Sequence, residues 1–188
     1  MLEEASEMEF SRIARLMLVV IAAVPFASTA YAGTTHEVEW RTIGASVHTS
    51  VDLDEKGSPA SFVVAEGDGT FGRASVQGMT EPVRVPIEKC PAGTAMEFHV
   101  VAGTMVRTFH DRLDQIFVQT VSGLACISQS GSVTSQNEAK ILGGTGRFEG
   151  ATGHISSRTL PQTVSFPEWE GEFNNIMNVS EGTIVLKD

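Results

Sequence analysis

The sequence predicts an all-β protein: a single small, closed antiparallel β-barrel of about eight strands, preceded by a signal peptide. Apolar and polar residues alternate with a period of two along most of the chain after residue 33, which is the strand pattern. Glycine-rich or polar breaks interrupt this alternation about every 8–12 residues, and such spacing is typical of a sandwich or a barrel. We favour the barrel because closure removes the unpaired edges that a strand-rich chain must otherwise protect.

The export signal is predicted over residues 1–32. Arg12 and Arg15 precede an uncharged apolar run at residues 16–24, and Ala30-Tyr31-Ala32 has the small residues that a signal peptidase reads. The alternative is a membrane anchor, which needs about 20 apolar residues, and this run has about half that length. We therefore expect cleavage after Ala32, no membrane anchor, and a secreted or periplasmic protein.

Four glutamates, at positions 3, 4, 7 and 9, lie ahead of the two arginines, where a signal is normally net positive. Translation from Met8 would remove three of them. The sequence therefore predicts Met8 as the true start.

The mature chain is acidic. Removing residues 1–32 takes away two of the 13 basic and four of the 23 acidic residues, and leaves 156 residues with a net charge of −8. This length suits one domain with a real core, at residues 33–188. The negative charge argues against nucleic acid as a partner, because phosphates require a basic face.

Cys90 and Cys126 are the only cysteines. In an oxidising compartment a lone pair most simply forms one disulfide, which would stabilise the fold by roughly 3–4 kcal/mol through loop-closure entropy. The alternatives are two buried thiols or one nucleophilic thiol.

Ten segments of the mature chain are strand candidates. Glycine-containing breaks between them are expected at residues 67–69, 122–123 and 180–182. The candidates are residues 36–48, 61–64, 71–77, 96–101, 105–109, 115–121, 132–142, 153–160, 171–179 and 183–186.

The most distinctive segment is residues 141–153, Ile-Leu-Gly-Gly-Thr-Gly-Arg-Phe-Glu-Gly-Ala-Thr-Gly. It matches neither the dinucleotide fingerprint nor the nucleoside-triphosphate loop, and no helix pattern follows it. We interpret it as a structural turn. Gly143, Gly144 and Gly146 allow positive φ, Gly150 and Gly153 bracket a second short turn, and Phe148 folds inward to plug one end of the barrel.

This segment resembles the penultimate-hairpin signature of the allene oxide cyclase-like and dirigent-like β-barrels, which many exported bacterial proteins share. Residues 67–74 and 114–117 lie where such chains often carry a G-x-G-x-x-G hairpin and a Gly-Asp strand entry, although Leu113-Asp114 stands where glycine is typical. The resemblance spans about residues 60–160. It implies an eight-stranded, often homo-oligomeric barrel whose central cavity holds an apolar ligand or steers a cyclisation. A shared fold does not establish a shared reaction.

Three charged residues are candidate ligand-binding groups. Met96, Phe98 and Val100 alternate with Glu97 and His99, and Arg107 lies on the next candidate strand. If the polar face pointed inward, Glu97, His99 and Arg107 would form a buried group able to bind a carbonyl or carboxylate. We favour the opposite arrangement, with the apolar face inside and these charged residues in solvent, because charged side chains are seldom buried.

The sequence indicates no metal, cofactor or catalytic site. A calcium loop that would begin at Asp52 has Lys56 at a ligand position and Val63 at the closing position. His110, Asp111 and Asp114 follow no standard zinc spacing, and no G-x-S-x-G elbow occurs.

The function predicted from sequence is therefore that of an exported barrel that binds a small apolar molecule or acts as an accessory protein outside the cytoplasm. The alternatives are a cyclase or isomerase of the allene oxide cyclase type, which needs few catalytic residues, and a dirigent-like protein that orients a coupling reaction.

We expect the protein recovered from its host's periplasm or medium to begin at Gly33, because the signal is removed after Ala32. N-terminal sequencing checks this, and an Ala32→Lys variant, in which cleavage is blocked, should retain the apolar run. The intact mass of that uncleaved variant should correspond to a start at Met8. An exported wild-type protein that still contains residues 16–24 would contradict the prediction.

Overall fold

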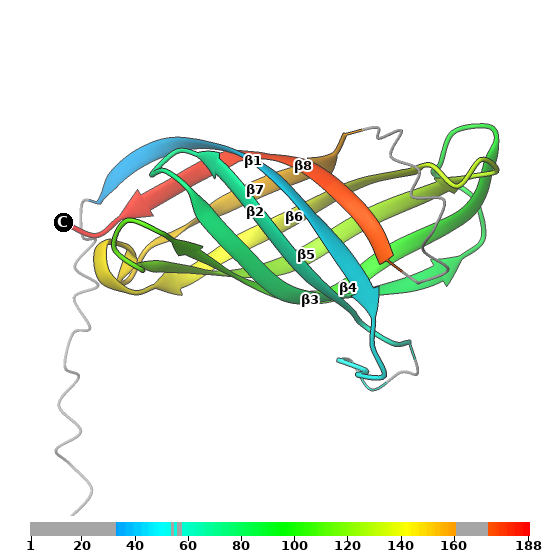
Figure 1. Cartoon of the computed structure of the whole chain (residues 1–188), viewed down its shortest axis with the longest axis horizontal. Coiled ribbons are helices and arrows are strands. Elements are labelled where there is room, and N and C mark those ends of the chain that lie inside the picture. The colour runs from blue at the N-terminus through cyan, green and yellow to red at the C-terminus, as the bar shows by residue number, and fades with distance from the viewer. Residues whose placement is uncertain (1–32, 54, 56–57, 161–172) are drawn as a thin grey trace, which may run out of the picture. The chain divides into compact units, whose positions relative to one another are not determined.

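The structure is a computed structural model that describes residues 33–53, 55, 58–160 and 173–188. It is all β, with one short 3₁₀ helix, and eight antiparallel strands form a closed barrel in chain order (Figure 1). The eight strands are β1 (Thr34–His48), β2 (Ser61–Gly69), β3 (Ala74–Val85), β4 (Thr94–Phe109), β5 (Gln115–Ser128), β6 (Val133–Gly144), β7 (Thr152–Thr159) and β8 (Phe173–Leu186). The predicted fold class is confirmed.

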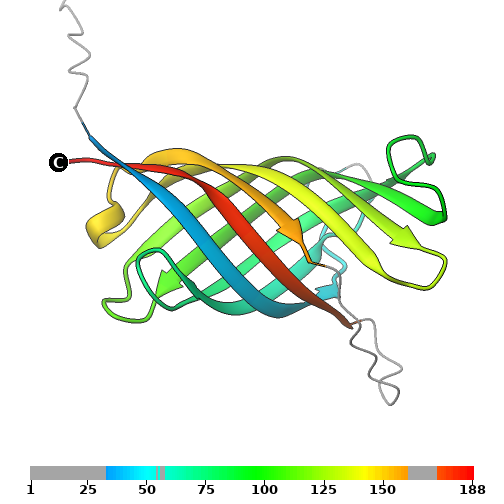
Figure 2. The ribbon, with the colours of Figure 1, turned by 90° about the horizontal axis from the view of Figure 1, so that it is seen from above.

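The barrel closes where its first and last strands pair. β1 and β8 are antiparallel neighbours from Thr34 opposite Leu186 to Val47 opposite Phe173, and Figure 2 shows the two strands side by side. With β1 paired to β2 on its other side, every strand of the barrel has a hydrogen-bonded neighbour on both sides.

The barrel unit comprises Ala32–Asp188. The predicted signal peptide, residues 1–32, lies outside the described residues, as do residues 171–172 of one predicted strand. No helix among the described residues is long and apolar enough to cross a membrane.

Several expected breaks lie inside strands. Residues 67–69 end β2, residues 122–123 lie within β5, and residues 180–182 lie within β8. The hairpin between β2 and β3 turns just after residue 69 instead, with positive φ at Phe71 (71°) and Gly72 (97°). Glycine can occupy a strand wherever a neighbouring backbone approaches closely, so glycine alone did not mark the turns here.

Two of the expected strands, 96–101 and 105–109, are one strand with a bulge in it. Glu81 of β3 pairs with Ala102 and Pro82 pairs with Val100, so Val101 is left without a partner on β3. In the same way, Val121 of β5 is left without a register partner on β6. A bulge adds one residue to one strand and reverses which later side chains face inward.

Large side chains fill one end of the barrel, which we call the closed end. Its core consists of buried residues from seven strands and from the segment between β6 and β7, namely Val38, Trp40, Ala74, Phe109, Ile116, Ile141, Phe148, Ala151, Ile155 and Ile184. The turns at residues 70–73, 110–114 and 145–151 all lie at this end.

Phe148 plugs the closed end, as the sequence predicts. It lies in the 3₁₀ helix η1 (Gly146–Phe148), is fully buried, and contacts the rings of Phe71 and Phe109, with centroids 5.2 and 4.9 Å away. Gly146 has a φ of 57° and lies so close to Asp114 that a Cβ would collide with its carboxylate.

Gly144 was expected to adopt positive φ, and this expectation was wrong. Positive φ occurs at Gly143, Gly146, Gly150 and Gly153 but not at Gly144. A Cβ at Gly144 would instead collide with the backbone of Gln115 and approach the Cβ of Phe148 to 2.7 Å. This glycine therefore makes room for the plug.

Arg147 locks the plug to the neighbouring turns. Its guanidinium donates two hydrogen bonds of 3.0 Å to Asp111 and one of 3.3 Å to the carbonyl oxygen of Phe71. It also lies 3.4 Å from the carboxylate of Asp114 and 5.0 Å from the ring centroid of Phe148. The hydrogen bonds from Arg147 lower the pKa of Asp111. Three turns that are distant in sequence are thus joined through one side chain.

We expect Phe148→Ala to lower the free energy of unfolding by about 3–5 kcal/mol, because it removes a fully buried ring and leaves a cavity. Leu142→Ala is the control, since Leu142 lies on the outer face and is 56% exposed, and should change stability by less than about 0.5 kcal/mol. Urea denaturation of both variants checks this. Equal losses in the two variants would contradict the role of Phe148 as a plug.

Candidate functional site

The remainder of the barrel interior is a cavity of about 520 Å³. It extends from the core at the closed end to the opposite end, where the lining residues Ser46, Met96, Phe98 and Ile127 are only half-buried. As formed by the described residues, the cavity is therefore accessible from that end, which we call the mouth. Its volume lies within the range of small-molecule sites, roughly 300–1,000 Å³.

The cavity has two chemically different walls. The wall formed by β3, β4 and β5 is mostly apolar, whereas the wall formed by β6, β7, β8 and β1 carries most of the hydroxyl and amide groups. The apolar set is Val76, Pro82, Met96, Phe98, Val100, Met105, Val118, Ala125 and Ile127, and the polar set is Thr42, Ser46, Ser135, Asn137, Ser157, Thr159, Asn178 and Ser180.

Hydrogen bonds link several groups of the polar wall to one another. Ser157 and Ser180 have hydroxyl oxygens 2.9 Å apart, and the hydroxyl of Thr159 donates to the side-chain oxygen of Asn178 at 2.9 Å. These bonds hold the side chains in place and lower the cost of burying them.

Asn137 differs from its neighbours on this wall. Its side-chain oxygen is buried without a hydrogen-bond partner among the described residues. Room for it exists because residue 123 is glycine, where a Cβ would collide with that oxygen.

Arg107 forms the floor of the cavity. The paired bulges place it inside, because Met96, Phe98 and Val100 point inward before Val101, and Met105 and Arg107 point inward after it. Its guanidinium carbon lies 4.4 Å from the centroid of the Trp40 ring on β1. Since β1 and β4 are not neighbours in the barrel, the side chain crosses the interior to reach that ring.

The positive charge of Arg107 has no counter-charge among the described residues. The residue is only 8% exposed, no carboxylate of the described chain forms an ion pair with it, and its Nη1 is buried without a hydrogen-bond partner. Burial lowers the pKa of Arg107 to about 10, so it remains protonated at neutral pH. The cation–π contact with Trp40 offsets about 2 kcal/mol of a desolvation cost that amounts to several.

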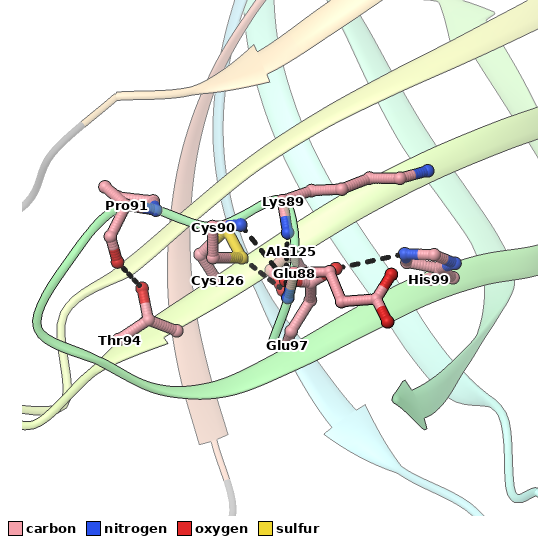
Figure 3. Close-up of a disulfide and its surroundings, with 9 residues drawn as sticks. All are labelled: Glu88, Lys89, Cys90, Pro91, Thr94, Glu97, His99, Ala125 and Cys126. Carbon is pink, nitrogen blue, oxygen red and sulfur yellow. Dashed lines mark hydrogen bonds and ion pairs between the residues drawn. A yellow bond between two sulfur atoms is a disulfide. The ribbon is translucent and has the colours of Figure 1, made fainter. Parts of the chain in front are cut away.

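Glu97 points to the outer side of the barrel wall and is nevertheless fully buried. The segment between β3 and β4 covers it. The backbone N–H groups of Glu88, Lys89 and Cys90 donate to one of its oxygens at 2.8, 2.8 and 3.0 Å, as Figure 3 shows. Burial raises the pKa of Glu97, but these three bonds and one to His99 outweigh it and bring the pKa down to about 2.

The disulfide fixes the same segment beside Glu97 (Figure 3). Cys90 and Cys126 are bonded, with Cα atoms 5.7 Å apart, and Cys126 is the register partner of Glu97 on β5. The predicted disulfide is therefore present. One covalent bond and one carboxylate together hold the segment against the outer wall near the mouth.

The three candidate ligand-binding residues are not one group. Glu97 and His99 lie on the outer wall, where Nε2 of His99 is 3.2 Å from the second carboxylate oxygen of Glu97, and Arg107 lies in the cavity. The favoured arrangement, with Met96, Phe98 and Val100 inside, is what the structure shows. The expectation that the charges lie in solvent was wrong for two of the three residues. Glu97 is fully buried under the segment between β3 and β4, and Arg107 lies in the cavity because the bulge at Val101 reverses the side chains that follow it.

The residues considered for metals have other partners. His110 lies 3.3 Å from Glu66, and Asp111 pairs with Arg147. Across the described residues no cluster of three or more His, Cys, Asp or Glu could hold a metal ion. Asp54 and Lys56 of the rejected calcium loop lie outside the described residues.

The fold and the site together define a class of protein: an eight-stranded barrel whose internal chamber is filled at one end and, in the part of the chain that the structure describes, accessible at the other. No protein-family model matches the chain, and no curated protein matches it.

We expect the Glu97→Gln variant to be less stable than the wild type at pH 7, because a neutral amide accepts the three backbone bonds more weakly than a carboxylate. The pKa of Glu97 is lowered by folding, so its contribution is fully present above about pH 4.5 and is lost as the pH falls toward 2. The difference in the free energy of unfolding should therefore shrink over that interval.

Urea denaturation at a series of pH values from 7 to 2 measures this difference. Glu88→Gln is the matched control, since Glu88 is an exposed carboxylate of the same segment, and it should show little difference at any pH. A Glu97→Gln deficit that is constant from pH 7 to 2 would sink the assignment.

Proposed function

We propose that the protein binds a small, largely apolar molecule inside the barrel and does so outside the cytoplasm. The observation that carries this proposal is the unfilled interior. An eight-stranded barrel is just narrow enough for side chains to fill it, and here they fill only the closed end. The cavity left above that core joins an apolar wall to a few fixed polar groups, the usual composition of a ligand site.

Binding is favoured over proton-transfer catalysis by the ionisable groups of the lining. Arg107 is the only ionisable side chain among the described residues that line the cavity. A guanidinium donates hydrogen bonds but does not exchange protons readily near neutral pH. A cyclase or isomerase of the allene oxide cyclase type, or a dirigent-like protein, would use the same chamber to orient a reactive molecule. For such a reaction the described residues that line the cavity would supply its shape and one positive charge, that of Arg107.

A location outside the cytoplasm is supported by two features. The Cys90–Cys126 disulfide is compatible with an oxidising compartment, where such bonds persist. The residues before the barrel carry the pattern of a secretory signal. A secreted or periplasmic protein that carries or senses a small molecule accounts for both the disulfide and the cavity.

We expect the wild-type protein to bind the neutral fluorescent probe N-phenyl-1-naphthylamine, and an Ala125→Phe variant to bind it about tenfold more weakly or worse, because the added ring occupies the cavity. Ala125 lines the cavity. Ala95→Phe is the matched control, since Ala95 is an exposed residue of β4, and should leave the affinity unchanged. Fluorescence titration measures all three.

A folded wild-type protein that does not bind the probe would overturn the proposal, as would equal affinity in the Ala125→Phe and wild-type proteins. Native mass spectrometry of the protein purified from its own host is the complementary measurement. It should detect a non-covalently bound small molecule that is lost from the Ala125→Phe variant.

A further inference from the structure

Arg107 is the feature of the cavity that an apolar ligand alone leaves unexplained. A purely apolar occupant would bury the guanidinium more completely and give it no hydrogen-bond acceptor, which makes the site worse for the charge. An ordered water would accept a hydrogen bond but would bring no negative charge. The missing component is an anion that enters with the ligand.

From this we infer that the ligand is an amphipathic carboxylic acid, whose carboxylate pairs with Arg107 at the floor of the cavity and whose apolar body extends along β3, β4 and β5 toward the mouth. This inference rests on the proposed function and specifies the chemical class of the molecule bound.

The contacts of Arg107 favour a carboxylate as the anionic group. Its guanidinium is planar, and its carbon lies over the Trp40 ring, 4.4 Å from the centroid, which holds the group at the floor of the cavity. A fixed planar fork is suited to bidentate pairing with a planar carboxylate. Trp40 itself is fully buried and is anchored through its indole N–H, which donates to the carbonyl oxygen of Thr70 at 2.6 Å. The floor is thus held in place before any ligand arrives.

The position of Arg107 sets the direction of the ligand. Along β4 the lining residues run from Arg107 through Met105, Val100 and Phe98 to Met96 at the mouth. Eleven residues of a tilted barrel strand correspond to roughly 25–30 Å along the axis. The chamber is therefore elongated, and apart from Arg107 at its floor the lining contributed by β4 is apolar. A ligand with one acidic end and a long apolar body fits if the acid enters first.

The polar wall opposite this lining has one unpartnered group as well. The side-chain oxygen of Asn137 is buried without a hydrogen-bond partner among the described residues. It lies on the same barrel face as the hydroxyls of Ser157 and Thr159. A hydroxyl group on the body of the acid would find a partner there.

The test compares dodecanoic acid with dodecanol, which differ only in the head group, as competitors of N-phenyl-1-naphthylamine at pH 8 and below micellar concentrations. We expect the wild-type protein to bind the acid about tenfold more tightly than the alcohol. Arg107→Gln should bind the two alike, through weaker binding of the acid, with the affinity for the alcohol and for the probe almost unchanged.

Two further variants separate the role of Arg107 from general effects of charge or folding. Arg107→Lys keeps the charge and should keep a preference for the acid. Arg41→Gln removes an exposed arginine from the outer face of β1 and should behave as the wild type. Binding of the neutral probe reports whether each variant is folded around an open cavity.

The inference is overturned if the wild-type protein binds acid and alcohol equally, or if Arg107→Gln retains the preference for the acid. Failure of the wild-type protein to bind even the neutral probe is a different result, because it overturns the proposed function itself.

Discussion

A barrel of eight strands encloses an interior that side chains can just fill, and this constraint decides what the protein can do. At the closed end the inward positions carry Trp40, Phe109, Phe148 and several isoleucines, and the interior is solid. Toward the mouth the inward positions on half of the circumference carry mostly serine, threonine, asparagine and alanine, and these side chains are too short to meet in the middle. The distribution of side-chain volume along the axis, more than the fold, makes the chamber.

Two of the buried charged residues of the described barrel, Glu97 and Arg107, are treated in opposite ways. Glu97 has three backbone N–H groups and His99 around its carboxylate, so its charge is fully solvated by the protein. Arg107 has the face of an indole ring and no acceptor for its Nη1. A satisfied buried charge is typical of structural sites, whereas an unsatisfied one calls for an explanation. Within one strand, Glu97 therefore has a structural role in holding a loop, whereas Arg107 is the residue for which we infer a bound anion.

The sequence predicted the fold because alternation and turn spacing are local properties. The inward position of Phe148 followed because it is the only large apolar residue between Gly143 and Gly153, and the disulfide followed because two cysteines have one possible pairing. The side on which Arg107 lies could not be predicted in this way. Alternation correctly predicts that Met96, Phe98 and Val100 face inward. Val101 is an extra residue in the strand that no local pattern marks, and after it the side chains that face inward and outward exchange places. The burial of Glu97 could not be predicted for another reason: it depends on a covering segment whose path is set by backbone hydrogen bonds.

Closure of the barrel through β1 and β8 has a consequence for when the fold can form. Until residues 173–186 are available, β1 has no partner on one side and the interior cannot be sealed from water. Pairing of the first strand with the last one has a high contact order, and such contacts form slowly and late. A chain of this topology therefore remains open until almost all of it has been synthesised. The export that we propose requires a chain that is not yet folded, and a barrel that closes only when its last strand pairs with its first meets this requirement for longer.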